Sequence, residues 1–181
     1  MNIFAISNDP KQAAEWMVDK HVVKMILETA QLLSTAHRIL DGTEYIDKTK
    51  TGRNVKRWRL PDERETVLYS ATHINHPSAV WCRTNFDNYN WLYKHFAALL
   101  EEYTHRYGKV HKCASMALTL RFTPQRIPLG NLTPVTPAMP DEYKVAGDSV
   151  ASYRNYYRVA KARMHKWTNR ETPEWISENV S

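Results

Sequence analysis

The sequence predicts an all-α protein, a compact single-domain helical bundle over residues 1–181 with long loops and a proline-rich connection. Three observations predict this fold class. The length of 181 residues is that of one domain. Apolar residues recur at three- and four-residue spacing along the long segments, which is the period of an amphipathic helix. After the first few residues, no run of alternating apolar and polar side chains predicts a strand.

The first long segment, residues 11–39, has the clearest helical pattern. Asn8-Asp9-Pro10 is a helix-start signal because proline fits the first helical turn, and Asp41-Gly42 ends the segment. Nothing between these signals breaks a helix, so we expect either one helix or two helices joined near Trp16. The expected buried stripe consists of Val22, Val23, Ile26, Leu27, Ala30 and Leu33.

The segment from about 43 to 64 differs in composition from the helix before it. Its centre, residues 49–54, is polar, and lysines and arginines crowd around it with Trp58 in the middle. We expect a basic loop on the surface, followed by a short helix within residues 63–72. The cations of this segment are Lys48, Lys50, Arg53, Lys56, Arg57, Arg59 and Arg64.

The rest of the chain contains two more long helical patterns and one proline-rich segment. Residues 79–107 predict a second long helical region, and residues 109–122 predict one further helix. Residues 123–140 contain five prolines, which exclude a helix and predict an extended connection packed on the body. A last helix is expected over residues 148–167, with Asp148 as its N-cap.

The composition combines a net charge of +6 with 10 Tyr, 6 Trp and 4 Phe. In a nucleic-acid-binding protein the cations neutralise phosphate and the rings stack on bases. The alternative is that the rings fill the core and the charge only aids solubility. No apolar run approaches the roughly 20 residues of a membrane span, and the N-terminus does not have the pattern of a secretory signal. Two cysteines, Cys82 and Cys113, are a poor disulfide framework, so we expect reduced thiols in a cytoplasmic protein.

The first candidate site is a polar face of the 11–39 segment. His21, Lys24, Glu28 and Gln31 are spaced by three, four and three residues, so they share one helix face away from the apolar stripe. A base, an ammonium group and a carboxylate held together can carry out acid–base chemistry or stabilise a cationic intermediate. The alternative is a solvated face with a Lys24–Glu28 pair worth a few tenths of a kcal/mol.

The remaining motifs predict DNA contacts and no cofactor. His73 and His76 are not accompanied by a closely spaced cysteine pair or an HExxH motif, so no metal site is expected. Glycine-rich phosphate loops and GxSxG are missing as well. Residues 153–161 alternate aromatic rings with cations, which favours contacts to a nucleic-acid backbone; alternatively, the tyrosines face the core and the cations face water. The expected DNA contacts are Arg53, Lys56, Arg57, Arg154, Arg158 and Lys161.

Three segments, taken in order, resemble a known family. Asp19-Lys20-His21 followed by Glu28 is similar to an Asp-x-His motif with a catalytic glutamate seven residues after the histidine. Residues 86–106 are similar to an aromatic-Asp…Leu…Lys helix, and residues 153–157 to a Trp-Tyr-Lys-Tyr-Tyr segment. The family is that of the pyrimidine-dimer DNA glycosylases of the phage endonuclease V type, which are small, basic, helical repair enzymes. The resemblance extends over most of the chain.

The resemblance implies a mechanism and a role for each residue of the polar face. An N-terminal α-amine attacks the sugar C1′ of a damaged nucleotide, the base leaves, a Schiff base forms, and β-elimination cuts the strand. Asn2 is a poor substrate for removal of the initiator methionine, so the amine is assigned to Met1. An α-amine suits this attack because it is a weaker base than a lysine side chain. Glu28 would stabilise the cationic sugar, His21 would contact sugar or phosphate, and Lys24 is a secondary candidate for the amine.

Three hypotheses therefore stand. The first is a DNA repair glycosylase with AP-lyase activity, monomeric and without a cofactor, acting on damaged pyrimidines in double-stranded DNA and not at a membrane. The second is a transferase that modifies a DNA base on the same scaffold, motivated by Leu27 and Gln31 at positions where the family carries arginines. The third is a non-catalytic nucleic-acid-binding module, which predicts salt-sensitive binding without any chemical product.

Overall fold

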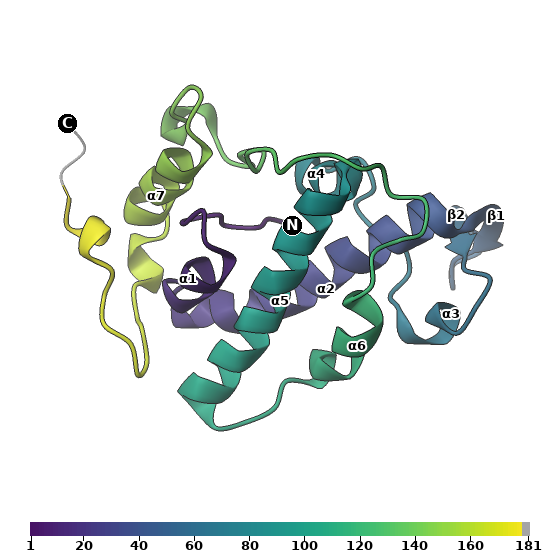
Figure 1. The fold of residues 1–181 in the computed structure, drawn as a ribbon, viewed down its shortest axis with the longest axis horizontal. Helices are drawn as coiled ribbons and strands as arrows, with labels where there is room; N and C mark the ends of the chain where they lie inside the picture. Colours follow the sequence, from purple (N-terminus) through teal and green to yellow (C-terminus); the bar gives the residue numbers. More distant parts are fainter. Residues whose placement is uncertain (179–181) are drawn as a thin grey trace.

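Two long helices cross at the centre of the molecule. The structure is a computed structural model that describes residues 1–178. Helix α2 (Asp19–Asp41) runs the length of the body, and α5 (Phe86–Tyr107) packs across it (Figure 1). Helices α1 (Pro10–Glu15), α4 (Pro77–Thr84) and α6 (Ala117–Leu120) pack against these two long helices. Helices α3 (Arg64–Val67) and α7 (Ser149–Val159) lie toward opposite ends of the molecule (Figure 1).

The prediction of an all-α fold is wrong, because residues 43–59 form a two-stranded antiparallel sheet. Strand β1 (Thr43–Lys48) pairs with β2 (Asn54–Arg59), and the turn between them uses Gly52 at a φ of 80°, in the left-handed region that favours glycine. The sequence reading missed this hairpin because charged side chains occupy both faces of the strands. The usual apolar–polar alternation of a strand is therefore hidden.

The 11–39 segment forms two helices, which is one of the two arrangements expected from the sequence. Asp9 caps α1 by accepting hydrogen bonds from the backbone N–H groups of Lys11 and Gln12, and α1 ends at the residue before Trp16. The predicted buried stripe of α2 is correct at its centre and wrong at Val23, whose exposed fraction is 42%. His21, expected on the polar face, is buried instead.

Two predicted helices are shorter than expected or divided. The helical region over 79–107 breaks at Asn85, whose extended backbone ends α4 and whose side chain caps α5. The helix predicted over 109–122 is instead a 3₁₀ turn (Lys112–Met116) followed by the single turn of α6. His111 is the N-cap of the 3₁₀ turn, and its side chain accepts a hydrogen bond from the Cys113 N–H.

The last predicted helix, 148–167, ends early. Asp148 caps α7 as predicted, but the helix stops at Val159. The chain after it is drawn to the start of α2, where the Lys166 carbonyl accepts a hydrogen bond from the Asp19 N–H. Trp167 Nε1 likewise donates to the Trp16 carbonyl. These contacts draw the chain after Val159 away from the helix that the sequence pattern predicts there.

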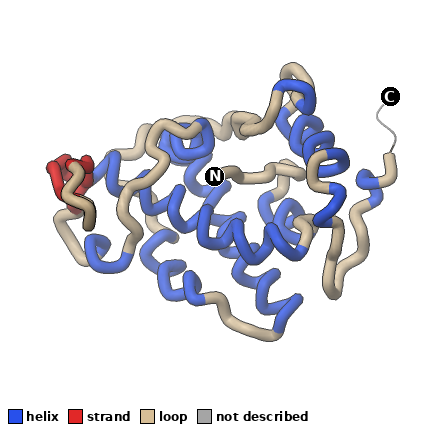
Figure 2. The backbone as a smooth tube through the Cα atoms, turned by 180° about the vertical axis from the view of Figure 1, so that it is seen from behind, coloured by secondary structure: helices blue, strands red, loops and turns tan. Residues whose placement is uncertain are grey.

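Residues 123–140 run as an extended connection from α6 to α7, past the end of α4, and contain neither helix nor strand (Figure 1). Both cysteines are buried and free. Within residues 1–178, no helix is both long enough and apolar enough to cross a membrane. Figure 2 shows the molecule from behind. The first residues run across the helices there, and their path lies between α7 and the rest of the body.

Candidate active site

The first residues of the chain are held inside the body. Asn2 is only 8% exposed, and its side-chain oxygen accepts hydrogen bonds from the Tyr153 hydroxyl and the Ile3 N–H, both at 2.8 Å. Its side-chain nitrogen donates to the carbonyl of Ala138 at 2.7 Å. The proline-rich connection and α7 therefore clamp residue 2, and this clamp fixes where the preceding residue, Met1, is placed.

The Met1 amine lies beside the carboxylate of Glu28. The amine nitrogen is 3.7 Å from Glu28 Oε2, and Lys24 Nζ is 3.5 Å from Oε1. Lys24 is 68% exposed, whereas Glu28 is 13% exposed and its Oε2 is buried without a hydrogen-bond partner among the described residues. A buried carboxylate oxygen without a donor is costly, so a group that arrives with a proton or a positive charge would be stabilised here.

His21 lies next to this pair as a neutral ring. It is 3% exposed, and burial lowers its pKa to about 3, helped by the positive charges of Lys161 and Lys24. Its Nδ1 is 2.8 Å from the Tyr157 hydroxyl, which also accepts a hydrogen bond from the Val18 N–H. With that hydroxyl donating to Nδ1, the ring carries its proton on Nε2. The Nε2–H has no hydrogen-bond partner within residues 1–178 and is available to a ligand.

Phe4 links the N-terminal residues to His21. Its ring stacks on the His21 ring with centroids 4.2 Å apart, and its backbone has a φ of 57°. That left-handed conformation is strained for a residue other than glycine, and it persists only where packing holds it. The stacked rings hold this bend and therefore help to aim the amine at Glu28.

These side chains line a cavity of about 350 Å³. Lys20, Lys24 and Lys161 supply positive charge around it, and Tyr156 and Met164 supply apolar wall. The Lys161 Nζ lies 4.8 Å from the centroid of the Tyr156 ring. The cavity thus combines a nucleophilic amine, a carboxylate, cations for phosphate and a flat ring for a sugar or base.

A buried ion network holds the elements around the cavity. Asp19 accepts hydrogen bonds from Arg106 Nη1 at 3.0 Å and from the Thr168 N–H and hydroxyl, and Arg106 also donates to Glu102 at 2.8 Å. Burial opposes ionisation of Asp19, but the hydrogen bonds from Thr168 and Arg106 lower its pKa overall. Asp19, Glu102 and Arg106, noted above for their resemblance to a family pattern, therefore join α2, α5 and the C-terminal segment.

The structure brings together five of the ten predicted site residues. They are Met1, His21, Lys24, Glu28 and Lys161.

The two α7 arginines of the predicted set lie elsewhere. Arg154 packs between Trp16 and Trp175, with its guanidinium 5.3 Å from each ring centroid, and donates to the Ile6 carbonyl. Arg158 donates to the Trp175 carbonyl. These contacts give both arginines a packing role. The other three predicted residues, Arg53, Lys56 and Arg57, belong to the β1–β2 hairpin and its turn.

Sequence reasoning missed several residues of the cavity. Lys20 and Tyr156 line it, but neither was predicted as a site residue, because the cavity depends on how the chain around α7 meets α2. His76, the N-cap of α4, was considered and rejected as a metal ligand. Burial lowers its pKa, as do the positive Met1 amine and His73, whereas the Glu28 carboxylate raises it. Its electrostatic coupling to the amine and to the carboxylate links it to this site. Within residues 1–178, no cluster of three or more His, Cys, Asp or Glu side chains is arranged to hold a metal.

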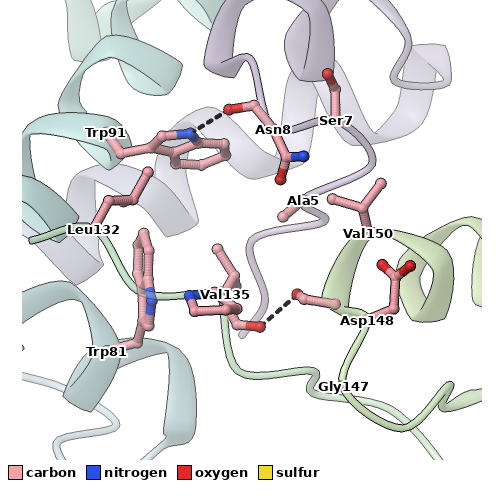
Figure 3. A pocket seen from close by; sticks show the side chains of 12 residues that line it. Ala5, Ser7, Asn8, Trp81, Trp91, Leu132, Val135, Gly147, Asp148 and Val150 are labelled. Atoms are coloured by element: carbon pink, nitrogen blue, oxygen red, sulfur yellow. Dashed lines mark hydrogen bonds between the residues drawn. The ribbon is translucent and has the colours of Figure 1, made fainter.

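A second, smaller cavity of about 190 Å³ lies between the N-terminal residues, α4, α5 and the start of α7 (Figure 3). Its polar groups serve the fold: Trp91 Nε1 donates to the Asn8 carbonyl, and the Ser149 hydroxyl donates to the Val135 carbonyl. No amine and carboxylate face each other in it, unlike in the cavity beside Glu28.

The cavity beside Glu28 places an amine and a carboxylate among three lysines. The family model for pyrimidine dimer DNA glycosylase matches residues 1–115, and the chain belongs to this family. Membership implies a DNA repair glycosylase, with DNA as the substrate. Comparisons with curated proteins and with solved structures found no match. The matched residues include Met1, His21, Lys24 and Glu28, and end before the proline-rich connection and α7.

Proposed function

We propose that the protein excises damaged pyrimidines from double-stranded DNA and then cuts the strand as an AP lyase, with the Met1 α-amine as nucleophile. The observation that carries this proposal is the Met1 amine 3.7 Å from the unpartnered Glu28 Oε2. Glu28 would accept a proton from the amine and then face the positive charge that develops on the sugar. Pairing the amine with a carboxylate activates it for covalent catalysis.

The proposed reaction proceeds in successive steps. The amine nitrogen bonds to C1′ as the glycosidic bond breaks, and the base leaves with that electron pair and takes up a proton. Ring opening and loss of the remaining proton from nitrogen give an imine. Removal of a C2′ proton then expels the 3′ phosphate by β-elimination, and water hydrolyses the imine to free the amine. The Nε2–H of His21 and the ammonium groups of Lys24 and Lys161 are assigned to sugar and phosphate oxygens.

The environment of residue 2 supports Met1 as the source of the amine. The side chain of Asn2 is held by Tyr153, Ile3 and Ala138, and the residue is buried. Asn2 also lines the cavity, but the amine that lies 3.7 Å from Glu28 Oε2 is that of Met1. Lys24 is the competing amine, but its side chain is 68% exposed, whereas the Met1 amine is held in the cavity beside Glu28.

Borohydride trapping on duplexes that contain an abasic site or a UV-induced dimer tests the proposal. Reduction should fix a covalent adduct, and peptide mapping by mass spectrometry should place it on the N-terminal peptide. Intact-protein mass checks that the chain begins at Met1. An adduct on the peptide that contains Lys24, or no adduct on either duplex, would contradict the proposal.

Glu28→Gln is the informative variant, with Glu101→Gln as its matched control. Glu101 is an exposed carboxylate on α5, and it receives the same chemical change. We expect Glu28→Gln to lower the rate of base excision by about 10²–10⁴-fold, the usual contribution of a positioned acid–base group. The control should retain the wild-type rate. Equal rates for both variants would remove Glu28 from the mechanism.

A further inference from the structure

The β1–β2 hairpin carries most of the excess charge of the chain. Residues 43–59 contain six lysines and arginines against two acidic residues, a net charge of +4 within a chain total of +6. The hairpin extends from the end of α2 that lies away from α7 (Figures 1 and 2). The positive charge is therefore concentrated at one end of the molecule.

The hairpin has a fixed base and no apolar core of its own. None of the side chains of β1 or β2 is buried, and an isolated two-stranded hairpin is at best marginally stable in water. At the base, the buried guanidinium of Arg38 donates to the Trp58 carbonyl at 2.8 Å. Gly42 allows the close approach there, since a Cβ at this position would lie 3.1 Å from Trp58 Cβ. The base is thus clamped to α2 while the rest of the hairpin projects.

The cations of the strands and the cations of the turn differ in their partners. On the strands, Lys56 pairs with Glu44 at 3.1 Å and Arg57 with Asp47 at 2.9 Å. Arg59 lies over the ring of Tyr45. At the tip, by contrast, three exposed cations make no salt bridge with any residue in the described part of the chain. They are Lys48, Lys50 and Arg53.

We propose that this hairpin is a DNA-binding arm whose tip cations, Lys48, Lys50 and Arg53, contact duplex DNA on one flank of the lesion. Charge complementarity favours a polyanion as the occupant, because phosphates provide the opposite charge and release counterions on binding. A two-stranded ribbon also fits the major groove of B-DNA, which is about 12 Å wide. The inference rests on the proposed function insofar as it takes duplex DNA as the substrate.

The length of α2 sets where on the duplex the arm makes contact. From Glu28 to Asp41 the helix rises about 20 Å, at 1.5 Å per residue. With a rise of about 3.4 Å per base pair, the base of the arm lies roughly six base pairs from the nucleotide at Glu28. The protected region of the duplex should therefore extend further on one side of the lesion than on the other.

The test compares Lys50→Ala/Arg53→Ala with Lys109→Ala/Lys112→Ala, which removes the same charge from exposed lysines beyond α5. Binding to an undamaged duplex is measured across a salt series. We expect the slope of log K against log salt to fall by about 2 in the tip variant, since each phosphate contact contributes about 0.9. The control should keep the wild-type slope. Hydroxyl-radical protection should disappear on one flank only, at or beyond about six base pairs from the lesion.

The outcomes separate this inference from the proposed function. An unchanged slope in the tip variant, an equal decrease in the control, or an equal loss of affinity for single-stranded DNA overturns the arm and leaves the proposed chemistry standing. A failure of the wild-type protein to form a trapped adduct overturns the chemistry, whereas the salt slope on undamaged duplex still reports on the arm. Matching thermal unfolding curves for the two variants verify that both are folded.

Discussion

The two ends of α2 use charge in opposite ways. Near its start, Asp19 and Arg106 meet in a buried network whose side chains are fixed by several hydrogen bonds each. Beyond its end, the ion pairs of the hairpin lie at the surface, and the tip cations form none with any of residues 1–178. Buried charge fixes the relative positions of elements, and exposed charge is free to attract a polyanion. The net charge of +6 alone does not distinguish the two roles.

The largest expected effect comes from breaking the buried network. Arg106→Ala should lower the free energy of unfolding by about 3–5 kcal/mol, because it removes the buried cation that Asp19 and Glu102 share and leaves Asp19 with Thr168 and Glu102 with Arg170. Urea denaturation monitored by circular dichroism measures this change. Arg121→Ala, which removes an exposed arginine, should change the same quantity by less than about 0.5 kcal/mol. Similar values for both would mean that the network does not hold the site together.

The next effect tests the clamp at the base of the hairpin. Gly42→Ala would place a Cβ 2.4 Å from the Arg38 carbonyl oxygen, so the backbone must shift. We expect a loss of about 1–3 kcal/mol in the free energy of unfolding, the usual cost of overpacking. Gly52→Ala, at the open turn, tests backbone strain without any such contact. If Gly42→Ala is neutral, the hairpin base is not fixed in the way described.

The next prediction concerns how the buried His95 makes stability depend on pH. Burial lowers the pKa of His95, which packs against α1, to about 4. Because the unfolded chain binds a proton at a higher pH than the folded one, stability is full above about pH 6.5 and falls as the pH drops toward 4. His95→Gln should reduce this fall by about 1 kcal/mol between pH 6 and pH 5.

Thermal or urea unfolding at several pH values measures that slope. His105→Gln serves as the control, since His105 is an exposed histidine on the same helix. An equal change of slope in both variants would exclude burial of His95 as the cause of acid sensitivity.

The smallest effect is expected from a hairpin ion pair. Lys56→Ala removes the partner of Glu44, but both side chains are largely exposed, so the free energy of unfolding should change by about 0–1 kcal/mol. The change should shrink further at high salt, because surface charges are screened. A loss comparable to that of Arg106→Ala would show that the two ends do not differ as described.

The fold could be predicted from the sequence where one physical signal dominated. The start of α1, the split near Trp16 and the Asp148 cap follow from local hydrogen-bonding chemistry, and they are confirmed. The hairpin could not be predicted, because exposed charges on both faces erase the alternation that a half-buried strand displays. The early end of α7 could not be predicted either, since it depends on contacts from Lys166 and Trp167 to distant backbone.

The candidate site could be predicted in part. The spacing of His21, Lys24 and Glu28 places them on one helix face, and the structure sets all three around one cavity. The burial of His21 was not predictable from spacing, because it depends on Phe4 and Tyr157, which come from opposite ends of the chain. For the same reason, the different surroundings of Arg154 on α7 and of Lys161 beyond its end could not be read from their alternation with tyrosines.

The hydrogen bond between Asn2 and Tyr153 also has a consequence for the order of folding. The two residues are separated by 151 positions, so the loop that their contact closes spans most of the chain. Contacts of such long range form late, after local helices have gathered their neighbours. The amine beside Glu28 is therefore aligned only once α7 has docked, and partly folded chains carry the amine without this geometry.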